Sequence, residues 1–173
     1  MDICSVRHGL KNKISQSDRI LVGFGGEWHV DTAERQEQIK RAAGVLKELL
    51  AGKDYFVITT LTGEDIRHIP CERTHMTAPL DVSFTEEEWE TYLRWLSFTL
   101  NKRTLLLELG EDLLHPNMIR WPFERAAGLN EKAYLYRINQ KLPQITEELA
   151  GRAVAVRLDS VEFFSVCSEA FKG

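Results

Sequence analysis

Residues 20–28 read ILVGFGGEW, a continuous apolar run that breaks into glycines. Residues 105–112 read LLLELGED and repeat this pattern. Strands that are buried on both faces of a parallel sheet have such uninterrupted apolar runs, and their carboxyl ends form the ligand crevice of doubly wound α/β folds. The two stretches therefore predict a nucleotide site beside the glycines. The sequence offers no equally convincing catalytic centre.

Short apolar runs alternate along the chain with longer segments of helical period. This alternation is typical of α/β folds with parallel sheets. The expected strands are residues 19–22, 55–60, 104–109, 133–138 and 153–156. We therefore expect a Rossmann-like, doubly wound and mostly parallel sheet of about five or six strands, flanked by helices.

Three of the expected helices have start signals in which a side chain caps free N–H groups of the first turn. These signals are Asp31 with Glu34, Thr85 with Glu88, and Asp159 with Glu162. The second signal precedes one apolar helical stripe, which consists of Trp89, Tyr92, Leu93, Leu96 and Leu100. Its aromatic side chains are interpreted as core. Pro116 suits the first turn of a further helix through residues 124–127, and Pro122 should kink or shorten that helix.

Length and composition indicate one compact domain of 173 residues that needs no covalent staples. The net charge of −4 is spread along the chain without a basic stripe, which argues against a nucleic-acid partner. The first eight residues are too polar for a secretory signal, and no apolar run approaches the ~20 residues that span a bilayer. We expect a cytoplasmic protein without a membrane partner. Cys4, Cys71 and Cys167 are far apart, so we expect reduced thiols and neither disulfides nor zinc.

The segment of residues 62–84 lacks a sustained period of either kind. It combines Gly63, Pro70 and Pro79 with two histidines and a cysteine, so it should be largely loop. Loops of this length in compact domains are usually functional or mobile. The segment is either a lid over the crevice or a surface excursion.

Five short motifs follow one another in the chain. They are residues 22–28 (VGFGGEW), 55–63 (YFVITTLTG), 107–110 (LELG), 119–124 (IRWPFE) and 136–139 (YRIN). In this order they resemble the Rossmann domain of bacterial sirtuin-like proteins, and the resemblance covers about residues 19–156. It implies a six-stranded parallel sheet with NAD lying across the carboxyl ends of the strands. It also implies that the Gly23 to Gly26 loop lies near the diphosphate and that Asn139 lies near the adenine ribose.

The chain departs from this family at positions that carry catalytic or cofactor-handling groups in active sirtuins. Active sirtuins carry an asparagine and an aspartate at the positions of Leu61 and Gly63, and a histidine just before a zinc module. The resemblance therefore implies a single sirtuin-like domain over residues 1–173, in which residues 62–84 stand in place of that module. His68 and His75 are weak candidates for a general base, because a loop histidine without a partner is more often a solvated side chain.

A set of residues near the expected crevice is predicted to contact NAD or ADP-ribose. It consists of Gly23, Gly25, Gly26, Glu27, Trp28, Thr59, Thr60, Gly110, Glu111 and Asn139. Trp28 could close over a ligand from the loop after the first strand. Carboxylates such as Glu111 and Asp112 should lower the affinity for a diphosphate. They could instead hold Mg²⁺ or Ca²⁺, but a solvated turn is favoured, and we predict no metal site.

Three functions are compatible with these observations. The favoured one is a catalytically weak or silent sirtuin-like domain, a pseudoenzyme that binds NAD, ADP-ribose or a related nucleotide. An active NAD-dependent deacylase or ADP-ribosyltransferase is the second. The third is an interaction module that has lost its ligand and uses its tryptophan-rich helices to bind a protein partner or to form a homo-oligomer.

Overall fold

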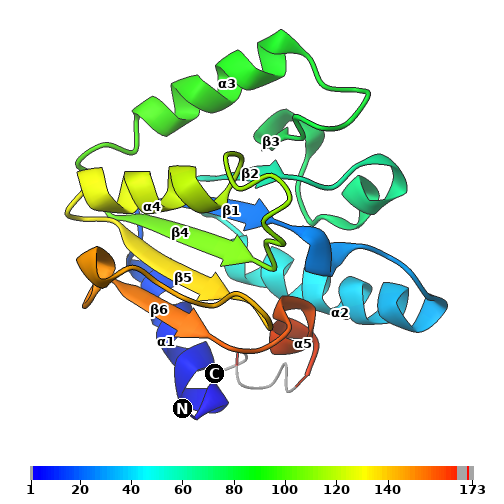
Figure 1. The fold of residues 1–173 in the computed structure, drawn as a ribbon, viewed down its shortest axis with the longest axis horizontal. Helices are drawn as coiled ribbons and strands as arrows, with labels where there is room; N and C mark the ends of the chain where they lie inside the picture. The colour runs from blue at the N-terminus through cyan, green and yellow to red at the C-terminus, as the bar shows by residue number, and fades with distance from the viewer. Residues whose placement is uncertain (1, 167–170, 172–173) are drawn as a thin grey trace.

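The computed structural model describes residues 2–166 and residue 171, and its centre is a six-stranded, all-parallel sheet (Figure 1). The strands are β1 (Arg19–Phe24), β2 (Tyr55–Thr59), β3 (Met76–Thr77), β4 (Thr104–Leu109), β5 (Tyr134–Ile138) and β6 (Ala153–Val156). Their order is β3-β2-β1-β4-β5-β6, which confirms the predicted Rossmann-like, doubly wound class. The order reverses between β1 and β4, where such sheets form their ligand crevice.

Helices cover both faces of the sheet, so its strands are buried (Figure 1). One face carries α1 (Ile3–Gln16), α2 (Ala33–Leu50) and α5 (Ser160–Ser165), and the other carries α3 (Glu86–Ser97) and α4 (Arg120–Leu129). Each face has its own hydrophobic cluster, and the first contains Leu107 whereas the second contains Leu106. Neighbouring residues of β4 thus point to opposite faces, as the period of a strand requires. Within residues 2–166, no helix combines the length and the apolar character needed to cross a membrane.

The predicted strands agree with the observed ones to within two residues at each end. β4 and β6 match the prediction, whereas β1 continues to Phe24. The sequence analysis did not predict β3, which has only two residues and pairs with Val57 and Ile58. A strand this short has no period to detect. The carboxylate of Glu88 holds its end in place by accepting hydrogen bonds from Thr77 Oγ1 at 3.2 Å and from the Ala78 N–H at 3.1 Å.

Two of the three predicted helix start signals are confirmed. Thr85 Oγ1 accepts a hydrogen bond from the Glu88 N–H at 3.2 Å, and Asp159 caps α5. The expectation for Asp31 is wrong, because α2 begins one residue later and Thr32 caps it through the Arg35 N–H at 3.0 Å.

The expectation for α4 also needs correction. The helix begins at Arg120, so Pro116 lies before it rather than in its first turn. Pro122 is the third residue of α4, in the first turn, where N–H groups have no partner within the helix. The proline therefore fits without a kink, and of the two predicted effects, a kink or a shorter helix, the later start at Arg120 agrees with the second.

The apolar stripe of α3 is only partly core. Tyr92 is buried, but the side chains of Leu93 and Leu100 are 45% and 66% exposed. The expectation that the aromatic side chains of the stripe are core is confirmed for Tyr92, whereas α3 and the turn after it present leucines to solvent.

The described cysteines are free thiols, since Cys4 is exposed, Cys71 is half-buried and neither forms a disulfide. The third predicted thiol, Cys167, lies outside the described residues.

Candidate functional site

A crevice of about 540 Å³ lies at the carboxyl ends of β1, β4 and β5. This volume is within the range of small-molecule sites, and the place is the one where doubly wound sheets bind ligands. Five of the predicted contact residues line it, namely Gly26, Glu27, Gly110, Glu111 and Asn139. The lining also includes His29 and charged side chains that were not predicted as cofactor contacts, among them Asp31, Arg35, Asp112, Lys141 and Asp159.

The glycines of the crevice allow two loops to interlock. A Cβ on Gly25 would lie 2.5 Å from the Cα of Glu111 and 2.6 Å from the carbonyl oxygen of Gly110. Gly110 has a φ of +69°, and a Cβ there would collide with the side chain of Glu27. The Gly25 N–H donates to the Leu109 carbonyl at 2.9 Å, and the Glu27 N–H donates to that of Gly110 at 3.2 Å. The loops after β1 and β4 pack so closely that this packing alone explains the glycines at positions 25 and 110.

Five of the predicted contact residues do not line the crevice, and they are Gly23, Gly25, Trp28, Thr59 and Thr60. Gly23 lies under α4, where a Cβ would be 2.6 Å from Ile119. Thr59 is buried and donates through Oγ1 to the Phe24 carbonyl at 2.8 Å.

Trp28 belongs to the core. Its side chain is 1% exposed, packs edge-on against Phe24 and donates through Nε1 to Ser160 Oγ at 3.1 Å. The expectation that Trp28 closes over a ligand is therefore wrong.

The Glu27 carboxylate ties three loops together. It accepts one hydrogen bond from the Gln140 N–H at 2.8 Å, and two from the N–H and Oγ of Ser160, both at 2.7 Å. Burial raises the pKa of this carboxyl above its usual range, against the opposing effect of these hydrogen bonds. The loops after β1, β5 and β6 are thereby fixed around the crevice.

The side chain of Asn139 is also held by hydrogen bonds to other residues of the crevice wall. Its Nδ2 donates to the Glu111 carbonyl at 2.6 Å, and its Oδ1 accepts from the N–H groups of Lys141 and Leu142. Asn139 therefore shapes the wall of the crevice by holding the loops after β4 and β5 together.

Glu111 is the most unusual titratable group in the crevice. Its side chain is 1% exposed, and Oε1 accepts from the Leu113 N–H at 3.0 Å, whereas Oε2 has no hydrogen-bond partner. Burial raises the pKa of Glu111 to about 7, and the negative charges of Asp112 and Glu108 act in the same direction. Within residues 2–166, no three His, Cys, Asp or Glu side chains lie close enough to hold a metal ion.

A buried ion network under α4 supports the wall of the crevice. Glu108 on β4 contacts Arg137 on β5 at 2.8 Å and Arg120 on α4 at 3.0 Å. Arg137 also pairs with Glu124 at 2.9 Å, and Arg120 donates to the carbonyl of Leu142 in the crevice wall at 2.7 Å. The sequence analysis did not identify this network. Its signal is the single glutamate inside an apolar strand, whose register partner is the arginine of the next strand.

His29 is a candidate functional residue that the sequence analysis missed. Its Nδ1 lies 2.6 Å from Asp65 Oδ2, and Asp65 Oδ1 accepts from the Val30 N–H at 3.1 Å. The carboxylate orients the imidazole, and His29 lines the crevice. Such a pair can transfer protons. Asp65 is 36 residues away in sequence, so no local motif reveals it.

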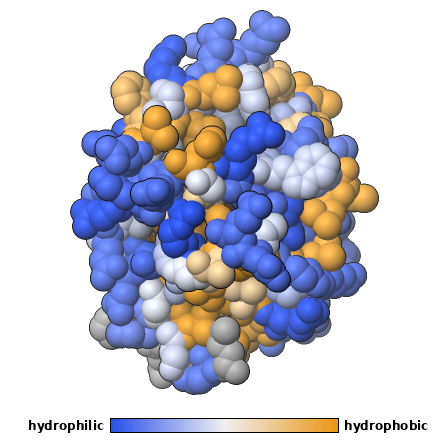
Figure 2. All heavy atoms as spheres, turned by 60° about the vertical axis from the view of Figure 1, so that its left-hand side comes forward, coloured by the Kyte–Doolittle hydropathy of each residue, from blue (hydrophilic) through white to orange (hydrophobic). Residues whose placement is uncertain are grey.

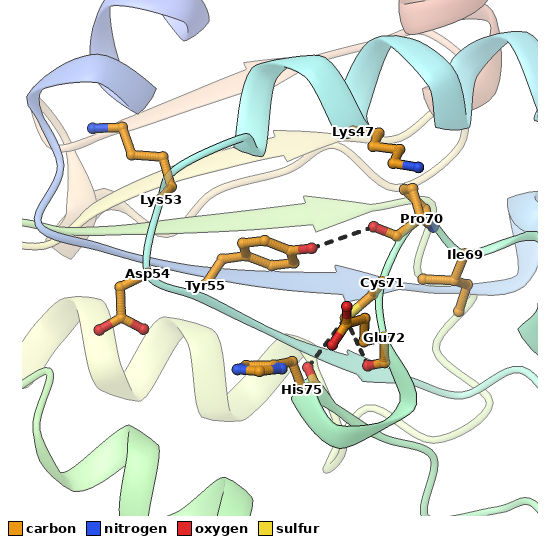
Figure 3. Close-up of a pocket in the computed structure, with 9 residues that line it drawn as sticks. All are labelled: Lys47, Lys53, Asp54, Tyr55, Ile69, Pro70, Cys71, Glu72 and His75. Atoms are coloured by element: carbon orange, nitrogen blue, oxygen red, sulfur yellow. Dashed lines mark hydrogen bonds between the residues drawn. The ribbon is translucent and has the colours of Figure 1, made fainter.

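The two histidines named from the sequence lie elsewhere. His75 lines a separate cavity of about 590 Å³ beside the amino end of β2, with Tyr55 and Cys71 (Figure 3). Burial raises the pKa of the Cys71 thiol to about 12, so this cysteine is not an activated nucleophile. His68 lies in the short helix η2 (Gly63–His68) and does not line the crevice.

Residues 62–84 do not form a lid. The segment contains η2, η3 (Arg73–His75) and the strand β3, joined by loop. None of these residues lines the crevice, although Asp65 contacts its rim through His29. Leu61, just before the segment, is 5% exposed and packs in the core.

Neither protein-family models nor curated proteins gave a match to this sequence.

Proposed function

We propose that the crevice binds a nucleotide diphosphate of the NAD or ADP-ribose type, with little or no turnover of it. The observation that carries this proposal is the position of the crevice, at the point where the strand order reverses between β1 and β4. Ligands of open α/β sheets bind at this point. The resemblance to the Rossmann domain of sirtuin-like proteins supports the same ligand class.

The carboxylates of the crevice should repel a bound diphosphate less strongly than their number suggests. Asp159 is paired with Arg35 at 2.8 Å, and Glu27 is held by three donors. Glu111 is substantially neutral below pH 7, because its pKa is raised to about 7. Lys141 is exposed, and its side chain has no ion pair or hydrogen bond within residues 2–166. This lysine is the cation best able to contact a phosphate.

Efficient NAD consumption lacks support from the residues present. The positions at which the sirtuin resemblance implies amide and carboxylate side chains hold Leu61 and Gly63, and Leu61 is buried in the core. Neither His68 nor His75 lines the crevice. Losing one positioned acid or base typically costs about 10²- to 10⁴-fold in rate.

One observation favours the alternative of residual chemistry. His29, oriented by Asp65, is a proton-transfer pair at the crevice. If nicotinamide release from NAD is detectable, His29→Ala should abolish it. His75→Ala, in the separate cavity, is the matched control and should leave it unchanged.

A thermal-shift comparison tests the binding proposal. A ligand at 100 times its Kd adds about 2.7 kcal/mol to the unfolding free energy and raises the midpoint. We expect this shift with NAD or ADP-ribose. No shift with either compound or with related nucleotides would contradict the proposal and favour an interaction module.

A further inference from the structure

An apolar groove of about 640 Å³ lies between the end of α3 and α4, on the face of the sheet away from α1 and α2. Its lining includes Leu96, Leu100, Trp121, Pro122, Ala126 and Leu129. Leu100, Trp121 and Leu129 are 66%, 58% and 73% exposed. Figure 2 shows apolar side chains gathered in the upper part of the face that includes these helix ends. Contiguous exposed apolar surface of this kind marks interaction sites in soluble proteins.

The shape of the groove suits a helix. Helix α4 borders it, together with the last turn of α3 and with Thr99 and Leu100 just after that helix. The strands beneath are already covered, since Leu21 and Leu106 are each 1% exposed. An extended peptide would find no open strand edge in this groove, whereas an amphipathic helix can place its apolar face between two helices.

The arginines at the groove indicate which kind of helix it would bind. Arg125 is the one charged residue that lines it within residues 2–166, and its side chain has no ion pair there. Arg94 lies one turn before Ser97 on the same face of α3, and it is also exposed without an ion pair within the described residues. No carboxylate among those residues lines the groove. In a symmetric pair of this chain with the groove at its centre, the two basic rims would face each other, and like charges repel.

We propose that the α3–α4 groove binds an amphipathic helix of another protein, with an apolar stripe that enters the groove and acidic residues on its flank. The groove is separate from the nucleotide crevice, so this inference does not depend on the proposed function.

Two helical probe peptides test the proposal, each with leucines at positions i, i+3, i+4 and i+7. One has glutamates on the flanks and the other has lysines. We expect fluorescence anisotropy to show at least about tenfold tighter binding of the glutamate peptide. The double variant Trp121→Ala with Leu129→Ser should weaken that binding by at least about tenfold. Both side chains are exposed, so the fold is retained. Arg125→Glu should reverse the preference between the peptides.

Leu114→Ser is the matched control. Leu114 is 75% exposed but does not line the groove, so this variant should bind like the unmodified protein. Equal affinity for both peptides, or no binding of either, would overturn the proposal. Sedimentation that shows a dimer dissociated by Leu129→Ser would overturn it in favour of a second copy as the occupant.

Discussion

Two buried glutamates that are close in sequence, Glu108 inside β4 and Glu111 in the loop after it, differ in the ion pairs that they form. Glu108 is 0% exposed and contacts two arginines, Arg137 and Arg120. Glu111 is 1% exposed, and its Oε2 has no hydrogen-bond partner. Burial raises the pKa of both carboxyls, but Glu108 forms ion pairs with two arginines, whereas Glu111 has no ion pair within the described residues and its pKa is raised to about 7. Loss of the Glu108 carboxylate should therefore leave buried arginines without their partner, whereas the charge of Glu111 should depend on pH near neutrality.

The largest expected effect is on the ion network under α4. Glu108→Gln leaves two buried guanidinium groups with only the partly exposed Glu124 to balance them. Removing one partner from a buried ion pair costs about 3–5 kcal/mol, so we expect a loss of unfolding free energy of this size in urea denaturation. The control Glu124→Gln, at a carboxyl that is 23% exposed, should cost markedly less. Equal losses for both variants would contradict the central role of Glu108.

The next effect concerns the interlocked loops. The glycine pattern alone predicts that Gly25→Val blocks a ligand and leaves the core folded. The structure changes this expectation, because a side chain at Gly25 meets the backbone of Gly110 and Glu111. Overpacking of this kind costs about 1–3 kcal/mol in unfolding free energy. Gly44→Ala on α2 is the control, since no atom lies within 4 Å of its added Cβ. It should stabilise the protein by about 0.5–1 kcal/mol. An unchanged midpoint for Gly25→Val would show that the loops separate easily.

A smaller, pH-dependent effect concerns Glu111. The pKa of Glu111 is raised from 4.5 to about 7 in the folded protein. The folded state therefore holds this proton more tightly than the unfolded state. Its contribution to stability is fully present below pH 4.5 and is lost as the pH rises through about 7. The difference in unfolding free energy between the unmodified protein and Glu111→Gln should shift by up to about 3 kcal/mol over that interval. Parallel pH profiles for the two proteins would contradict a raised pKa at Glu111.

The sequence predicted the sheet well because buried parallel strands leave a strong local signal. Residues 105–109 are apolar apart from Glu108, and the strand predicted over residues 104–109 has the observed ends. The start of α3 followed from Thr85 and Glu88, whose hydrogen bond joins residues three apart. Local patterns of this kind do not depend on which distant residues pack against them.

The site was predicted less completely because its contacts are distant in sequence. Glu27 meets Ser160 across 133 residues, and His29 meets Asp65 across 36. A glycine that accommodates a neighbouring loop has the same sequence signal as one that accommodates a ligand, so Gly25 was expected to face NAD. Trp28 lies in a loop, where sequence alone does not reveal the core that surrounds it.

Calorimetric titration with ADP-ribose tests the proposed nucleotide site most directly. The proposal predicts saturable binding at pH 6, weaker binding at pH 8 as Glu111 gains its negative charge, and little pH dependence in Glu111→Gln. Lys141→Glu should weaken binding at both pH values by about tenfold, since it reverses a charge at the crevice. The control Lys132→Glu, at an exposed lysine that does not line the crevice, should bind like the unmodified protein. Absence of binding by the folded, unmodified protein at pH 6, or equal binding by the unmodified and Lys141→Glu proteins, would contradict a nucleotide site in this crevice.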